Sequence, residues 1–148
     1  MKTQAIRGYF VIAAALILLG IMPIRAGTPA LDVSLVQLIA NPTNYDGKFV
    51  RVVGYANLEF EGQAIYLHHD DCEYFATKNG LWLEVSDDIL KRKDDLNQKY
   101  VVVEGVFNAS EKGHMNLWSG SIEHISLVQK CLTREEISKK LTASGQHN

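Results

Sequence analysis

The sequence predicts a mainly β domain, a five-stranded Greek-key barrel with short flanking helices, preceded by an export signal. Three observations lead to this expectation: a basic and then apolar N-terminus, five segments rich in β-branched and aromatic residues, and a glycine late in two of those segments. Roughly 120 residues follow the leader, which is enough for one domain with its own core.

The first 26 residues have the composition of a secretory signal peptide. Two basic residues precede an apolar run over residues 9–22. A membrane-spanning helix needs about 20 apolar residues, so this run is short for a span. We expect cleavage after Ala26, with cleavage after Ala30 or an uncleaved anchor as alternatives. The predicted location is periplasmic or secreted, with no stable membrane span after cleavage.

The part of the chain after the leader is acidic. The whole chain has 15 Lys and Arg and 17 Asp and Glu; the leader holds three of the basic residues and no acid, which leaves 12 basic against 17 acidic residues and a net charge of −5. Because Lys and Arg drive binding to a phosphate backbone, we expect no nucleic-acid partner. An acidic surface suits a basic protein partner.

Two cysteines, Cys72 and Cys131, follow the leader. An even number of cysteines in an exported protein favours a disulfide. Such a bond would close a loop of about 60 residues and stabilise the fold by roughly 4 kcal/mol in the chain-entropy model. We therefore expect a Cys72–Cys131 disulfide, with two free thiols or a shared metal ion as alternatives.

The domain, residues 31–132, is expected to begin with a helix. The segment from Asp32 to Asn44 has apolar residues at helical spacing, Asp32 or Ser34 to cap it, and a proline near its end. An Asp46-Gly47 turn then leads into the first strand.

Five segments of β-branched and aromatic residues predict five strands. They are residues 48–56, 64–68, 81–85, 99–107 and 117–128. Gly54 and Gly105 lie late in the first and fourth strands, where a bulge or bend is expected. Residues 86–96 predict a short helix with an acidic first turn. Residues 133–148 predict a C-terminal helix and tail, with Thr133 and Glu136 spaced as in a capping box.

Five strands with a short helix between the third and fourth resemble the OB fold, a small Greek-key barrel. Residues 47–54, together with residues 79–84, 100–105 and 113–122, are also similar to a group of small, uncharacterised exported bacterial proteins with OB-like domains. The resemblance covers roughly residues 34–128. It implies a fold and no particular function.

In OB folds, ligands bind the face of strands two and three, between the loops that join strands one and two and strands four and five. Side chains alternate along a strand, so Ile65 and Leu67 are expected to point inward and Tyr66 and His68 outward. The same alternation turns Leu81, Leu83 and Val85 inward in the next strand. It leaves Trp82 and Glu84 outside.

The predicted ligand-binding residues are therefore Tyr66, His68, Trp82 and Glu84, with His114 on the rim. Tyr66 and Trp82 would stack on the ligand, and the polar groups would hydrogen-bond to it, which suits a saccharide or a peptide. In the alternative arrangement, a terminal helix covers this face, and both aromatic rings form a second core layer. Two acidic residues, Glu59 and Glu61, would border the site from the first loop.

The run from His68 to Cys72 contains residue types that bind zinc or copper. Adjacent histidines in a strand point to opposite faces, and the spacing matches no zinc motif, so we expect neither a metal nor another cofactor. We also find no nucleophile motif and no phosphate loop in the sequence, and acidic doublets are usual on solvated surfaces. Catalysis is therefore not expected.

The expected function is that of an exported, non-enzymatic binding module for a cell-envelope saccharide, a peptide or a protein. A protein inhibitor, an immunity protein or an assembly accessory of an envelope machine is the first alternative. A metal-binding periplasmic protein is the second. The sequence does not set the oligomeric state.

Overall fold

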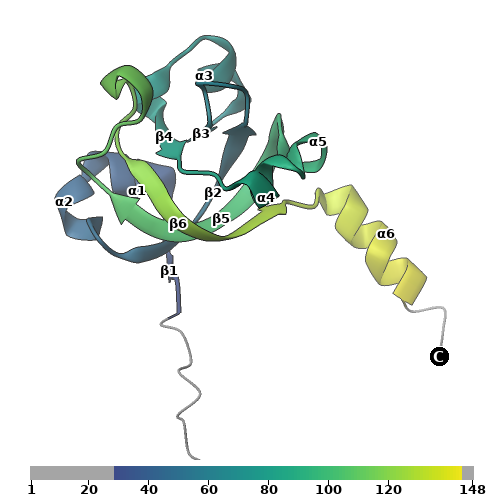
Figure 1. The fold of residues 1–148 in the computed structure, drawn as a ribbon. Coiled ribbons are helices and arrows are strands. Elements are labelled where there is room, and N and C mark those ends of the chain that lie inside the picture. The colour runs from purple at the N-terminus through teal and green to yellow at the C-terminus, as the bar shows by residue number, and fades with distance from the viewer. Residues whose placement is uncertain (1–28, 145–148) are drawn as a thin grey trace, which may run out of the picture.

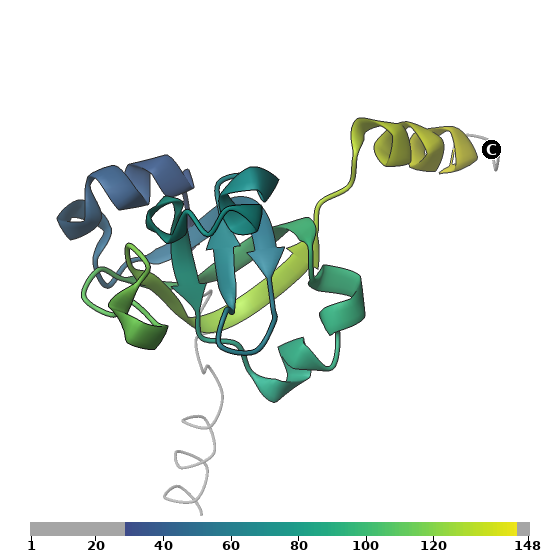
Figure 2. The same cartoon turned by 90° about the horizontal axis from the view of Figure 1, so that it is seen from above.

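The computed structural model describes residues 29–144, so the predicted signal peptide lies outside the described part of the chain. The elements follow in the order β1 (Leu31–Asp32), α1 (Leu35–Ala40), α2 (Pro42–Tyr45), β2 (Phe49–Asn57), β3 (Ala64–Tyr66), α3 (His69–Glu73), η1 (Thr77–Asn79), β4 (Gly80–Leu83), α4 (Asp87–Leu90), α5 (Lys93–Leu96), β5 (Lys99–Asn108), η2 (His114–Asn116), β6 (Ser121–Lys130) and α6 (Arg134–Ser144). Short helices surround the sheet, and α6 projects away from it (Figure 1, Figure 2). Among residues 29–144, no helix is both long and apolar enough to cross a membrane.

Five of the strands form a closed barrel. Their order is β2-β3-β4-β6-β5, and β5 pairs again with β2. The β4–β6 pair is parallel, and the other four pairs are antiparallel. This arrangement confirms the predicted OB-like barrel (Figure 1).

The short strand β1 was not predicted, and it pairs in parallel with the first half of β2, while β3 pairs with the second half. Gly54 lies between these two stretches of β2. A Cβ atom at Gly54 would lie 2.6 Å from both Ile65 Cγ1 and the Tyr66 carbonyl oxygen, so only glycine lets the strands approach there. An expected irregularity is confirmed at Gly105, where the register of β5 against β6 shifts, whereas β2 pairs with β5 through Gly54 without a shift.

The helices are shorter than predicted. The segment expected to form one helix over residues 32–44 instead holds the last residue of β1, all of α1 and most of α2. Ser34 caps α1 in a capping box with Gln37, and Pro42 begins α2, because proline suits the first turn of a helix. At the C-terminus the predicted capping box is confirmed: the Thr133 N–H donates to Glu136 Oε2 over 2.7 Å, and the Glu136 N–H donates to Thr133 Oγ1 over 3.2 Å.

The main core fills the barrel with inward-facing strand residues and with leucines from the flanking helices. Leu35 and Leu38 enter it from α1 and Leu96 enters from α5, and each is at most 1% exposed. These helices lie on opposite sides of the barrel (Figure 1, Figure 2). Burying such side chains is worth about 1.5–3 kcal/mol each relative to exposure, so α1 and α5 are held mainly by their leucines.

The predicted disulfide is not formed, because Cys72 and Cys131 are both free thiols. Cys72 lies in α3 beside Tyr55 of β2, whereas the Cys131 N–H donates to the carbonyl of Tyr100 in β5. The rings of Tyr55 and Tyr100 pack edge to face with their centroids 5.5 Å apart, so each cysteine lies next to a different member of this tyrosine pair. Burial raises the pKa of both thiols.

Candidate functional site

The predicted alternation of β3 and β4 is confirmed. Ile65, Leu81 and Leu83 are at most 1% exposed and belong to the barrel core. Tyr66 and Trp82 belong to the opposite face, in a second and smaller cluster. The face on which OB folds bind ligands is therefore aromatic here, as expected from the sequence.

This aromatic face is not open. Tyr66 is only 2% exposed, so its predicted exposure is wrong, and Trp82 is half-buried. The cover is the β5–β6 loop, residues 109–120, and not a terminal helix. Trp118 of this loop is 3% exposed and packs on Trp82, with ring centroids 4.9 Å apart and planes at 60°. A Cβ atom at Gly113 would lie 2.5 Å from the Trp82 ring, so the loop backbone also lies directly against it.

Hydrogen bonds tie the β5–β6 loop to the β3–β4 connection, residues 67–79, and to the start of β4. The Ser119 N–H donates to the Gly80 carbonyl over 3.2 Å, and Ser119 Oγ donates to the Lys78 carbonyl over 2.8 Å. Lys78 Nζ donates to the Trp118 carbonyl over 3.4 Å. The two connections thus close this end of the barrel together.

Among the described residues, one buried polar group of the β5–β6 loop, the indole N–H of Trp118, lacks a hydrogen-bond acceptor in regular geometry. Burial raises the pKa of the Tyr66 hydroxyl, and the nearby Trp118 N–H partly offsets that rise. The sequence missed Trp118 as a site residue because its segment reads as the start of the last strand, which begins only at Ser121.

The other predicted site residues lie at the surface. His68 is exposed at the N-cap of α3, and its N–H donates to Asp71 Oδ2 over 3.0 Å. Glu84 is exposed just after β4, and His114 is exposed in η2, on the loop that covers Trp82. The structure therefore brings Tyr66 and Trp82 together around Trp118, and not as an open stacking surface.

A group of potential metal ligands, His69, Asp70 and Glu73, overlaps the run from His68 to Cys72, for which the sequence predicts no metal ion. His69 Nδ1 is 3.0 Å from Asp70 Oδ1 and 3.6 Å from Glu73 Oε2, and all three side chains are exposed. His69 also packs edge-on against the Tyr55 ring. The sequence pattern predicts strand alternation here, but α3 begins at His69. The spacing of a helix therefore determines which side chains lie beside His69. His69 thus has carboxylate neighbours within α3 and an aromatic neighbour in β2.

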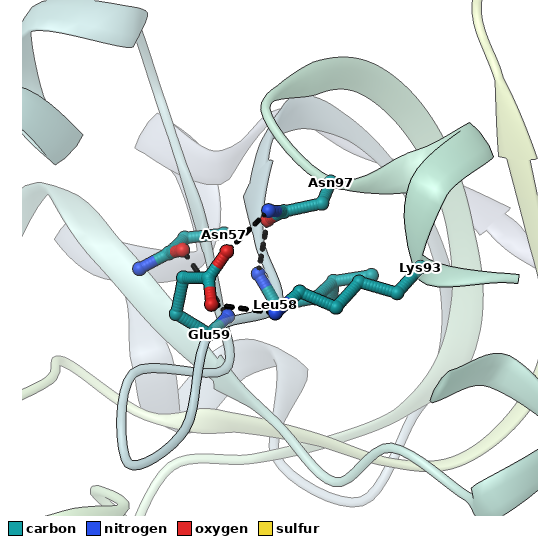
Figure 3. A network of polar contacts seen from close by, with 5 residues as sticks. All are labelled: Asn57, Leu58, Glu59, Lys93 and Asn97. Carbon is teal, nitrogen blue, oxygen red and sulfur yellow. Dashed lines mark hydrogen bonds and ion pairs between the residues drawn. The ribbon is translucent and has the colours of Figure 1, made fainter. Parts of the chain in front are cut away.

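The opposite end of the barrel carries the β2–β3 loop, residues 58–63, which is held by a polar network (Figure 3). Asn97 Oδ1 accepts the Leu58 N–H over 2.7 Å, and Asn97 Nδ2 donates to Glu59 Oε1 over 2.7 Å. Lys93 Nζ donates to Glu59 Oε2, and Asn57 Oδ1 accepts the Glu59 N–H. The hydrogen bonds from Lys93 and Asn97 lower the Glu59 pKa.

Phe60 stands at the tip of this loop. It is 86% exposed, the largest exposed fraction among the large hydrophobic residues of the described chain. The Gly62 N–H donates to the Glu59 carbonyl over 3.0 Å and closes a tight turn around Phe60. Glu61, at the third position of that turn, has a φ of 57°, which type II turns require and which glycine adopts most readily. The turn thus projects an aromatic ring outward from an anchored loop.

The arrangement offers two distinct features, a closed aromatic cluster at one end of the barrel and an anchored, exposed phenylalanine at the other. Comparison of this chain with protein-family models, with curated proteins and with solved structures finds no match.

Proposed function

We propose that this protein is an exported, non-enzymatic interaction module that binds a protein partner through the loops at the ends of its barrel. The observation that carries the proposal is the contrast between the covered sheet face and the exposed loops. Phe60, Tyr74, Phe75 and Met115 lie in connections between strands and are each at least 75% exposed. Exposed large aromatic side chains are enriched where proteins bind one another.

A protein partner is favoured over a small stacked ligand because the chain's own Trp118 occupies the space against Trp82. Ligand pockets are concave and bury most of their ligand, whereas the aromatic side chains of this face already bury one another. The exposed His69, Asp70 and Glu73 do not favour a metal function, because all three lie on the solvent-facing surface of one short helix and exposed acidic groups are common without an ion.

Native and denaturing mass spectrometry of the exported protein, purified without chelator, tests the proposal alongside mild cross-linking and affinity purification from the source cells. We expect equal native and denatured masses for the isolated chain and one protein recovered at constant stoichiometry with it. A native mass that includes a metal or an organic ligand would overturn the proposal. So would the absence of any stoichiometric protein after cross-linking.

A further inference from the structure

We propose that the β2–β3 loop is the primary docking element, and that Phe60 inserts into an apolar pocket on a basic surface of the partner protein. This inference rests on the proposed function and narrows it to one end of the barrel and one kind of partner. It follows from three independent features of this loop: its anchoring, its charge and its backbone strain.

The anchoring lowers the cost of binding. Asn97 fixes the loop where it leaves β2, Lys93 and Asn97 hold the Glu59 carboxylate, and the Leu83 N–H donates to the Gln63 carbonyl over 2.9 Å where the loop enters β3. The loop is therefore fixed on both sides of Phe60. A contact residue on a pre-organised loop loses less conformational freedom on binding, so more of its burial appears as affinity.

The charge around Phe60 selects the partner. The β2–β3 loop and the adjoining segment 84–99 together contain seven Asp or Glu and four Lys or Arg, a net charge of −3 in a described chain whose net charge is −5. Lys93 is engaged by Glu59, and Lys91 by Asp88 over 2.7 Å. The loop and this segment are therefore acidic, and complementary potentials steer a basic surface toward Phe60.

The strain at Glu61 is the third feature. A non-glycine residue in the left-handed region costs about 1–2 kcal/mol, and the turn needs that conformation directly beside Phe60. Folding alone would favour glycine at this position. A carboxylate kept at a strained and exposed position next to the aromatic tip fits a role in contact with a positively charged partner.

The test places a photo-activatable benzoylphenylalanine at position 60 of the full chain in the source cells, and at position 75 in a second variant. Phe75 is a matched control: it is 81% exposed, has a φ of 54° and lies at the other end of the barrel. We expect position 60 to cross-link to one protein through a Lys- or Arg-rich peptide, and position 75 to give none of this product.

Binding of that purified protein is then measured by calorimetry at low and high salt. We expect Phe60→Ala to weaken the affinity at least tenfold with an unchanged melting temperature. Val36→Ala, at a side chain 53% exposed on α1, should leave the affinity unchanged. Glu61→Lys should weaken binding most at low salt, where exposed charges are least screened.

Each other outcome overturns the inference in a recognisable way. Cross-links from position 60 to a second copy of this chain would identify self-association, and cross-links only to lipid would identify a membrane surface. A protein cross-linked from position 75 and not from position 60 would refute this docking surface and leave the proposed function standing. No protein cross-link from either position, together with an organic ligand in the native mass, would refute both.

Discussion

The two ends of the barrel differ in whether the aromatic ring of the loop is itself buried. The β5–β6 loop is fixed by burial of Trp118, which is 3% exposed against the sheet face, together with the hydrogen bonds of Ser119 and Lys78. The β2–β3 loop is fixed by hydrogen bonds to Lys93 and Asn97, while Phe60 at its tip is 86% exposed. A ring that is buried to hold its loop cannot contact a partner, whereas a ring on a loop held by polar groups stays exposed. The comparison indicates that an aromatic residue is available for binding where polar groups, and not the ring itself, hold the loop.

The largest expected effect comes from removing the apolar anchor. Trp118→Ala should destabilise the protein by about 3–5 kcal/mol, because it deletes a buried indole from the second core cluster. The chain has two tryptophans, so Trp82 becomes the sole emitter in this variant. We expect its emission to shift to longer wavelength as the loop leaves it. Urea unfolding and fluorescence check this, and a loss below about 1 kcal/mol with unchanged emission would contradict apolar anchoring.

Gly113→Ala should have the next largest effect. Gly113 has φ 64° and ψ −161°, a conformation that is essentially restricted to glycine and costs other residues about 1–3 kcal/mol. Its Cβ would also meet the Trp82 ring. Gly47→Ala is the control, because Gly47 has a φ of 71° but nothing within 4 Å of its built Cβ. Thermal unfolding should show a larger loss for Gly113→Ala than for Gly47→Ala, and equal losses would mean that contact with Trp82 contributes nothing.

Strand alternation was predictable from the sequence, and the cover over the outer face was not. The period of two in β3 and β4 correctly assigned Ile65 and Leu81 to the core and Trp82 to the outer face. Whether that outer face meets solvent depends on the path of the β5–β6 loop. Trp118 looks like a strand residue in a run of apolar and β-branched residues, and only the tertiary fold turns it back onto Trp82.

The polar network that holds the β2–β3 loop could not be predicted from the sequence either. Glu59 and Asn97 are separated by 38 residues, and no local pattern pairs them. The disulfide prediction was wrong for the same reason, since a count of two cysteines carries no geometry. Local chemistry such as the Thr133–Glu136 capping box was predictable because both partners lie within one turn of a helix.

Asn97→Ala tests the polar anchor. The variant leaves the N–H of Leu58, a residue only 2% exposed, without its acceptor and should cost about 1–3 kcal/mol. Asn97→Asp keeps that acceptor but places a second carboxylate beside Glu59, so it should be destabilised at neutral pH and recover when the pH falls. Urea unfolding at neutral pH and at an acidic pH distinguishes the two variants. Equal losses at every pH would show that the Glu59 contact plays no part.

Glu59→Gln should give a smaller effect that depends on pH. The folded-state pKa of Glu59 is lowered by its hydrogen bonds, so the wild-type carboxylate contributes stability above its unfolded pKa of about 4.3 and loses it as the pH falls through the folded value. The variant should therefore unfold at lower urea than the wild type at pH 7, and the difference between the two midpoints should shrink as the pH is lowered below the unfolded pKa. A constant difference between the midpoints would exclude ionisation of Glu59 as the cause.

Glu61→Gly should have the smallest effect, and its sign is informative. Glycine removes the left-handed strain of about 1–2 kcal/mol, but it also increases the entropy of the unfolded chain by an amount worth about 0.4–1 kcal/mol. We therefore expect a net stabilisation of at most about 1 kcal/mol in urea unfolding, together with weaker binding of the cross-linked partner. Gain of stability with loss of affinity would show that the glutamate is kept for contact and not for folding. A destabilised variant would instead assign Glu61 to the anchoring of the loop, and the contrast between the two ends of the barrel would then rest on Phe60 alone.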